Sequence, residues 1–136
     1  MTRREIREHI FKELFLAAFY DADEYAEQCA RYREDLEGAK DEEMTELAEK
    51  AAAVAAQIPR LDAAIDAVAE GWKTSRMGKV ELTILRLALY EMEQDENVPL
   101  RVAINEAVEL AKIYRCEDSP SFVHPILRKL ARGMDE

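Results

Sequence analysis

One segment near the middle of the chain, residues 80–92, constrains the fold more than any other stretch. Its few polar residues do not gather on one face of a helix: Glu81, Thr83, Arg86 and Glu91. A helix that is apolar nearly all round buries most of its surface. We therefore predict that residues 80–92 form the central helix of a helical bundle.

The chain is short of helix-breaking residues, with four glycines and four prolines among 136 residues. This scarcity indicates an all-α fold, and the length suits a single domain over residues 1–136. No apolar run reaches the roughly 18 residues that a membrane span needs, and the charged N-terminus does not resemble a secretory signal. We therefore predict a cytoplasmic protein without a membrane segment, in which Cys29 and Cys116 are buried or incidental free thiols.

Capping residues and prolines predict the helices before the central one. Thr2 can cap a helix that runs to about residue 20, and a second helix covers about 24–36. Acidic residues 41–43 open a third helix at its positive end. Pro59 kinks or divides this segment, and its apolar stripe continues to Trp72. We expect Trp72 to be a core anchor rather than a surface for stacking.

Two further helices follow the central one. Pro99 suits the first turn of a helix because its φ is fixed, so we place the start of the next helix there. The last helix begins at Pro120 or at Pro125. The second start is favoured because Pro125 pushes the residue before it out of helical geometry.

Part of this region resembles the signature of a known family. Residues 98–112 contain Val98-Pro99 and then the run VAINEAVELAK, and the flanking blocks 80–91 and 117–123 fall in the matching order and spacing. They look like those of NusB, the bacterial transcription antitermination factor family. The resemblance implies a NusB-like all-α fold of two packed three-helix groups, with about seven helices.

The resemblance also implies a function. NusB proteins bind boxA RNA of ribosomal RNA transcripts together with NusE, a small-subunit ribosomal protein. The complex tethers RNA polymerase to the transcript and suppresses premature termination. The partners implied for this chain are therefore boxA-type single-stranded RNA, NusE and the RNA polymerase antitermination complex.

The first helix carries basic side chains that are candidates for binding RNA phosphates: Arg3, Arg4, Arg7 and Lys12. Charge alone also allows a solvated face that Glu5 and Glu8 balance at helical spacing. Basic side chains at the N-terminal end of a helix oppose its dipole, which favours a role beyond stability. The resemblance implies that this arginine-rich helix contacts RNA.

Asp118 and Phe122 are candidates for contacts with RNA bases. An aromatic ring beside a polar loop can stack on an unpaired base, although a phenylalanine here can also pack in the core against the last helix. The resemblance implies that this loop flanks the RNA path. The family usually has Asn-Gly after the Phe-Val pair, whereas this chain has His124-Pro125, so the shape of the loop can differ.

The candidates for binding the ribosomal partner are Tyr20, Glu81 and Glu91. Glu81 interrupts the start of the central helix, and we expect its carboxylate to be exposed there, where it suits a basic protein. Arg86 lies inside the same helix and needs a carboxylate or carbonyl groups to be tolerated. We expect Glu106 or Glu109 of the next helix to supply the carboxylate.

The sequence contains no recognisable catalytic or metal-binding constellation. It has no glycine-rich phosphate loop and no His-Glu-x-x-His or Glu-x-x-His pair. Its histidines, His9 and His124, have no cysteine at ligand spacing. The chain is also too short for the methyltransferase domain that accompanies a NusB-like domain in some RNA-modifying enzymes. We predict no enzymatic activity, no cofactor and no metal.

Two alternatives to an RNA-binding factor remain open. The net charge is −10, and residues 21–49 carry twelve acidic and three basic side chains. This excess opposes RNA binding, in which phosphate contacts supply most of the affinity. One alternative is therefore a NusB-fold protein-interaction adaptor that has lost or weakened RNA binding, which His124-Pro125 also favours. The other is a homodimer that buries the arginine-rich helix until a partner competes.

Overall fold

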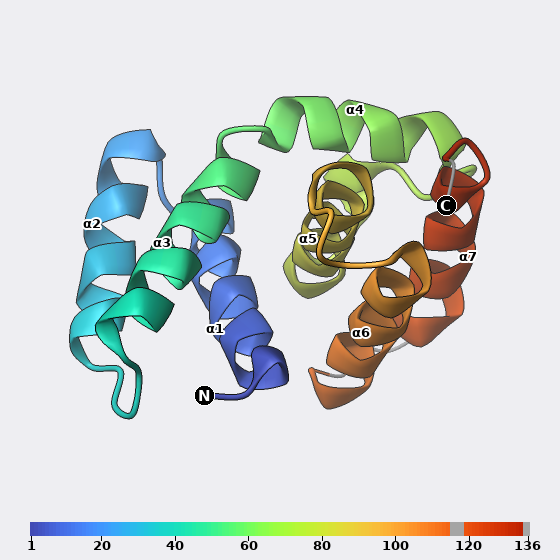
Figure 1. The fold of residues 1–136 in the computed structure, drawn as a ribbon. Helices are drawn as coiled ribbons and strands as arrows, with labels where there is room; N and C mark the ends of the chain where they lie inside the picture. The colour runs from blue at the N-terminus through green and yellow to red at the C-terminus, as the bar shows by residue number, and fades with distance from the viewer. Residues whose placement is uncertain (115–118, 135–136) are drawn as a thin grey trace. The chain divides into compact units, whose positions relative to one another are not determined.

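The computed structural model describes residues 1–114 and 119–134, and the regular elements within these residues are all helical (Figure 1). The chain divides into two compact units, Met1–Ala56 and Gln57–Glu136. Among the described residues, the first unit holds three α-helices and the second holds four. The predicted all-α class is confirmed. In the described part of the chain, no helix is both long enough and apolar enough to cross a membrane.

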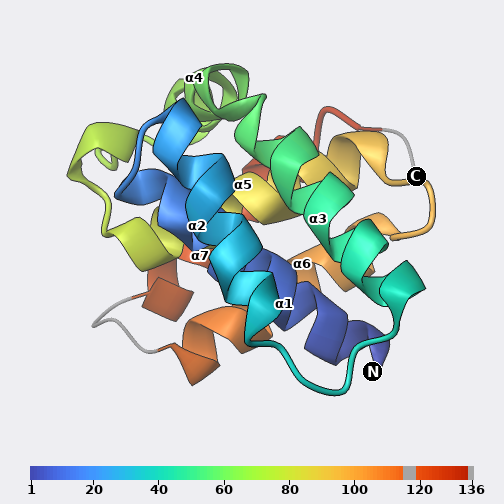
Figure 2. The same cartoon turned by 90° about the vertical axis from the view of Figure 1, so that its left-hand side faces the viewer.

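The first unit contains α1 (Arg3–Phe15), a 3-10 turn η1 (Leu16–Ala18), α2 (Ala22–Glu34) and α3 (Asp41–Ala55), seen in Figure 2. As predicted, Thr2 caps α1: its Oγ1 accepts a hydrogen bond from Glu5 N at 3.1 Å, and its own N–H donates to Glu5 Oε1 at 2.9 Å. The bond from the Thr2 N–H stabilises the charged carboxylate and lowers the pKa of Glu5.

A partly buried ion pair joins α1 to α2. The carboxylate of Glu13 is fully buried and accepts a hydrogen bond from Arg33 Nη1 at 2.5 Å. Burial outweighs this partner and raises the pKa of Glu13. Cys29 lies beside it, with Sγ 3.8 Å from the Glu13 carbonyl, and burial raises the thiol pKa to about 11. Cys29 is thus a protonated, buried thiol, as predicted, whereas Cys116 lies outside the described residues.

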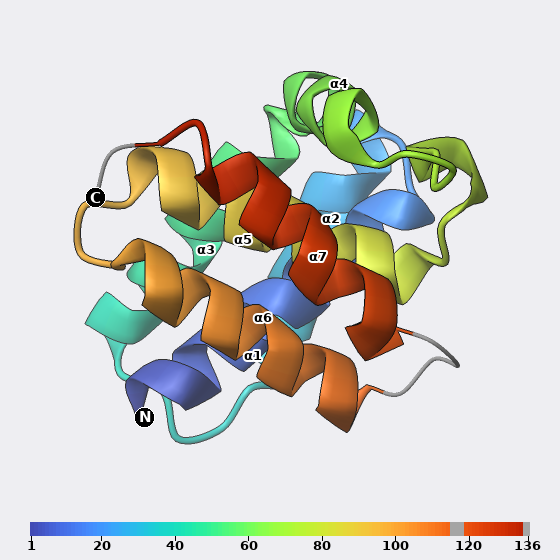
Figure 3. The same ribbon diagram turned by 90° about the vertical axis from the view of Figure 1, so that its right-hand side faces the viewer.

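The second unit is built around α5 (Figure 3). Its elements are α4 (Ile58–Val68), a 3-10 turn η2 (Thr74–Arg76), α5 (Lys79–Gln94), α6 (Leu100–Ile113) and α7 (Ser119–Ala131). Helix α5 packs against α4, α6 and α7, and ten of its sixteen residues are buried. The prediction that residues 80–92 form a buried central helix is confirmed.

Arg86 finds a different partner from the one expected. Its Nε and Nη2 donate to the two carboxylate oxygens of Asp62 on α4, at 2.8 and 2.7 Å. The prediction of Glu106 or Glu109 on α6 was wrong, because the Arg86 side of α5 faces α4. Sequence spacing does not tell which of three neighbouring helices a buried side chain meets.

The ends of two helices also differ from prediction. Helix α4 stops at Val68 instead of continuing to Trp72, and the chain then turns through Gly71, whose φ of +77° favours glycine. Helix α7 begins at Ser119 and passes through Pro125, so the alternative start at Pro125 was wrong. A proline inside a helix removes one hydrogen bond. The buried apolar face around it, which includes Val123 and Leu127, compensates for that loss.

Candidate nucleic-acid interface

The predicted basic cluster extends along α1, from Arg3 and Arg4 in the first turn to Lys12 in the last turn. Arg3 and Arg4 are exposed, whereas Arg7 and Lys12 are partly buried. Arg3 and Arg7 are four residues apart and therefore share one face of the helix. Lys12 lies 3.9 Å from Glu8, one turn earlier. Arg3, Arg4 and Arg7 can therefore offer several cationic groups to a polyanion from one side of the helix, whereas Lys12, nine residues after Arg3, lies on the opposite side.

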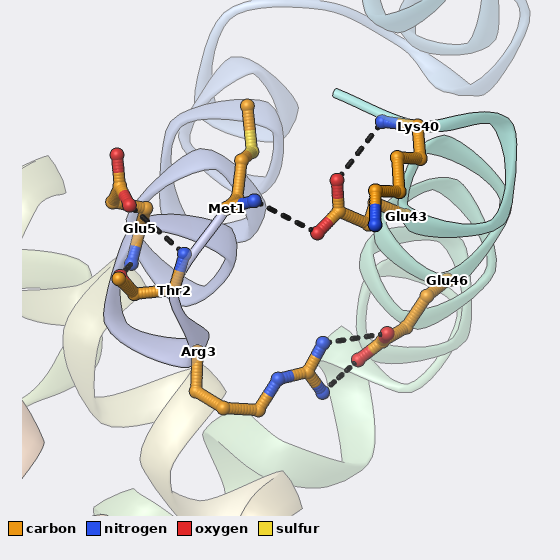
Figure 4. A network of polar contacts seen from close by, with 7 residues as sticks. All are labelled: Met1, Thr2, Arg3, Glu5, Lys40, Glu43 and Glu46. Carbon is orange, nitrogen blue, oxygen red and sulfur yellow. Dashed lines mark hydrogen bonds and ion pairs between the residues drawn. The ribbon is translucent and has the colours of Figure 1, made fainter. Parts of the chain in front are cut away.

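Acidic residues of α3 contact the start of α1 (Figure 4). The guanidinium of Arg3 forms a bidentate ion pair with the Glu46 carboxylate, with N–O distances of 2.5 and 2.8 Å. The N-terminal amino group of Met1 donates to Glu43 Oε2 at 3.0 Å, and the N–H of Lys40 donates to Glu43 Oε1 at 2.9 Å. These hydrogen bonds lower the pKa of Glu43.

This pairing bears directly on the availability of Arg3. The Arg3 side chain is 72% exposed and that of Glu46 is 42% exposed. An ion pair so open to solvent contributes little to stability, so a phosphate can replace the Glu46 carboxylate at small cost. The acidic residues of α3 weaken the positive field of α1 without blocking it. No local pattern in the sequence predicts this contact, because the two residues are 43 positions apart.

Phe122, on the first turns of α7, is buried, with 7% of its surface exposed. Its ring stacks on the indole of Trp72, with the centroids 4.9 Å apart and the planes 12° from parallel. Trp72 itself is 48% exposed, so the prediction that it is a core anchor was wrong. It follows the end of α4 and covers Phe122 from outside. Asp118, the other predicted base contact, lies outside the described residues.

Nearly the whole chain is similar to one family. Residues 4–132 match the NusB family. The chain belongs to the NusB family. Among its relatives, the transcription antitermination protein NusB of Agathobacter rectalis is 47% identical over 131 residues, which are 96% of this chain and 100% of that protein. The corresponding protein of Lachnoclostridium phytofermentans is 44% identical over 130 residues, 96% of this chain and 98% of that protein.

A solved structure supports the same assignment. NusB of T. maritima superposes with a TM-score of 0.82 at 29% sequence identity, covering 97% of this chain and 92% of that one. The family resemblance carried by residues 80–91, 98–112 and 117–123 is therefore confirmed, and so is the NusB-like fold.

The partner-binding candidates of this NusB family member are less accessible than expected. Tyr20 is partly buried, and Glu81 and Glu91 are only 4% and 2% exposed. The expectation of an exposed Glu81 carboxylate was wrong. Glu81 occupies the third position of α5 and folds back over Gly78, where an added Cβ would lie 2.2 Å from Glu81 Oε2. Acidic residues suit this end of a helix, which accounts for Glu81 structurally.

Within the described ranges, no three histidine, cysteine or acidic side chains gather in a way that could hold a metal ion. The first unit gathers cationic side chains on α1, and the second unit separately stacks the rings of Trp72 and Phe122. Such groups bind phosphates and bases.

Proposed function

We propose that this chain is a transcription antitermination factor that acts in the cytoplasm. It binds boxA-type single-stranded RNA of ribosomal RNA transcripts together with the small-subunit ribosomal protein NusE. The complex joins RNA polymerase to the transcript and suppresses premature termination. The observation that carries this proposal is the similarity, along almost the full length of both chains, to proteins named transcription antitermination protein NusB.

The proposed RNA contacts divide into two groups. The phosphate contacts come from the basic side chains of α1: Arg3, Arg4, Arg7 and Lys12. Asp118 and Phe122 contribute on the base side, and the burial of Phe122 beneath Trp72 means that its ring must be uncovered to meet a base directly. The exposure of Arg3 and Arg4 supports the first group, since a phosphate can reach them without rearrangement of the backbone. The ribosomal partner contacts Tyr20, Glu81 and Glu91, and the burial of both glutamates means that their side chains must move to meet it.

One observation favours a second function, a protein-interaction adaptor with weak RNA binding. Arg3 is paired with Glu46, Met1 is paired with Glu43, and the whole chain has a net charge of −10. RNA must displace these contacts and approach an acidic protein, which slows association and increases the dependence on salt. The adaptor shares the fold and the protein partner of the first proposal but lacks the RNA.

The two functions are separated by measuring equilibrium binding of a boxA-type RNA at low salt, first to this protein alone and then in the presence of NusE. An antitermination factor binds the RNA more tightly when NusE is present, and a scrambled RNA of equal length binds more weakly. An adaptor binds NusE, and its binding to either RNA is weak or absent and is not tightened by NusE. Failure to bind NusE and boxA RNA would contradict both functions.

The contact between α1 and α3 leads to a specific prediction. Replacing Glu46 with glutamine removes the carboxylate that competes with RNA for Arg3 and should tighten RNA binding by up to about fivefold, the upper range for an exposed ion pair. Glu49→Gln is the matched control, because it removes the same charge from an exposed position of α3. Equal affinities for the two variants would show that Arg3 gains nothing from the loss of Glu46.

A further inference from the structure

We propose that Trp72 is a stacking platform for an unpaired RNA base. This inference rests on the proposed RNA-binding function and extends it to a second place on the molecule. Phe122 is the aromatic residue expected to meet a base, yet its ring is buried beneath Trp72. The indole is the ring of this pair that a base can reach without any change in the fold.

The geometry leaves one side of the indole open. The rings of Trp72 and Phe122 are nearly parallel, so Phe122 covers one indole face. Since 48% of Trp72 is nevertheless exposed, this exposure lies on the opposite face and the edges of the ring. A base placed on that face would extend the stack to three rings. Aromatic rings prefer such offset parallel arrangements, and every base has a π-face to offer.

The segment that carries Trp72 is held in place. Its N–H donates to the carbonyl of Ala69 at 2.9 Å, which closes a turn at the end of α4. Two residues further on, Thr74 donates from both its N–H and its Oγ1 to the carboxylate of Asp66, at 2.7 and 2.9 Å. With Phe122 beneath the ring, these bonds fix the platform before RNA arrives. Binding therefore costs little ordering of the protein.

The charges around the platform suit a nucleic acid. Lys73, Arg76 and Lys79 follow Trp72 closely, all three are exposed, and no acidic residue lies between positions 72 and 79. The acidic residues nearby include Asp66, whose carboxylate is bound to Thr74, and Glu70, whose carboxylate lies 3.9 Å from Lys129 Nζ. An aromatic face bordered by cations binds a base and its phosphate together. A basic ribosomal protein, by contrast, would be repelled by this border.

Trp72 is the single tryptophan of the chain, so its fluorescence reports on this site alone when tyrosine is not excited. Stacking of a base on the indole should quench the emission when boxA-type RNA is titrated into the protein with NusE. An oligomer of equal length with abasic residues carries the same phosphates and should leave the emission unchanged. Equal quenching by the abasic oligomer would overturn the proposal. A shift in emission caused by NusE alone would also overturn it, because Trp72 would then face the protein partner.

Two substitutions separate stacking from simple bulk. Trp72→Leu keeps Phe122 covered but removes the π-face, and should weaken RNA binding by about tenfold, within the range for one base–aromatic stack. Trp72→Phe keeps a π-face and should remain within about threefold of wild type. Neither removes a cation, so the dependence of affinity on salt should not change. Circular dichroism and thermal unfolding confirm that both variants fold.

The outcomes distinguish this inference from the function on which it rests. If RNA binds, Trp72 emission is unchanged and Trp72→Leu binds as wild type, the platform is wrong and the antitermination proposal stands. If no boxA-type RNA binds at low salt even with NusE, both proposals are wrong. Quenching together with a selective loss in Trp72→Leu supports both.

Discussion

Replacing Arg3 and Arg7 together with alanine should weaken binding of boxA-type RNA by at least roughly ten- to a hundredfold at low salt, since the loss of even one hydrogen bond to a charged group costs about 1.5–3 kcal/mol. The lower part of this range is favoured because Arg3 must first leave Glu46. The log–log dependence of affinity on salt should become shallower by on the order of 0.7 for each lost phosphate contact. Titrations over a salt series with NusE present measure both quantities.

The matched control is Arg31→Ala/Arg101→Ala, which makes the same change in net charge at exposed positions outside the proposed RNA contacts. Arg31 pairs only locally, with Glu27 one turn away. This control should retain nearly the wild-type affinity and salt slope. Equal losses in the two double variants would mean that RNA responds to the overall charge of the protein. The cluster on α1 would then have no special role.

The features of the fold that the sequence predicted best are those that depend on the pattern of neighbouring residues. The apolar run at residues 80–92 identified α5, and Thr2 identified the start of α1, because period and capping are properties of neighbouring residues. The family motif identified the fold. By contrast, the continuation of α7 through Pro125 depends on the packing of a whole helix face. The conformational restriction on the residue before a proline takes no account of that packing.

For the candidate site, the sequence identified the residue types but not their contacts. The basic character of α1 is visible in its first turns, yet the Arg3–Glu46 pair joins residues 43 positions apart. The stacking of Trp72 on Phe122 likewise joins α7 to the segment after α4. The burial of Glu81 against Gly78 was missed in the same way, although a glutamate three residues after the residue that caps a helix is a recognisable local pattern.

The second large effect is expected at the ion pair that crosses the core of the second unit. Arg86 lies on the buried helix α5, and the Arg86 and Asp62 side chains are 11% and 23% exposed. Removing one partner of a fully buried pair costs about 3–5 kcal/mol, because the other charge is left without compensation. Arg86→Met should cost less, about 2 kcal/mol, since water can reach the more exposed Asp62 carboxylate. Asp62→Leu should cost about 3 kcal/mol, because the guanidinium it leaves behind is more deeply buried.

The double variant Arg86→Met/Asp62→Leu should recover most of both losses. It removes both charges and leaves apolar side chains between α4 and α5, an exchange that is often close to neutral. Urea unfolding measures all four proteins, with unchanged slopes as the sign that the same surface is exposed. Arg60→Met is the control, because the Arg60 and Glu93 side chains of its pair are more open, at 48% and 26% exposure. This substitution should cost no more than about 1 kcal/mol.

Two outcomes would show that Arg86 and Asp62 do not act as a buried unit. Either Arg86→Met destabilises the protein as little as the control does, or the double variant loses the sum of the two single effects. Arg86 would then be tolerated in α5 because its stem packs against apolar neighbours.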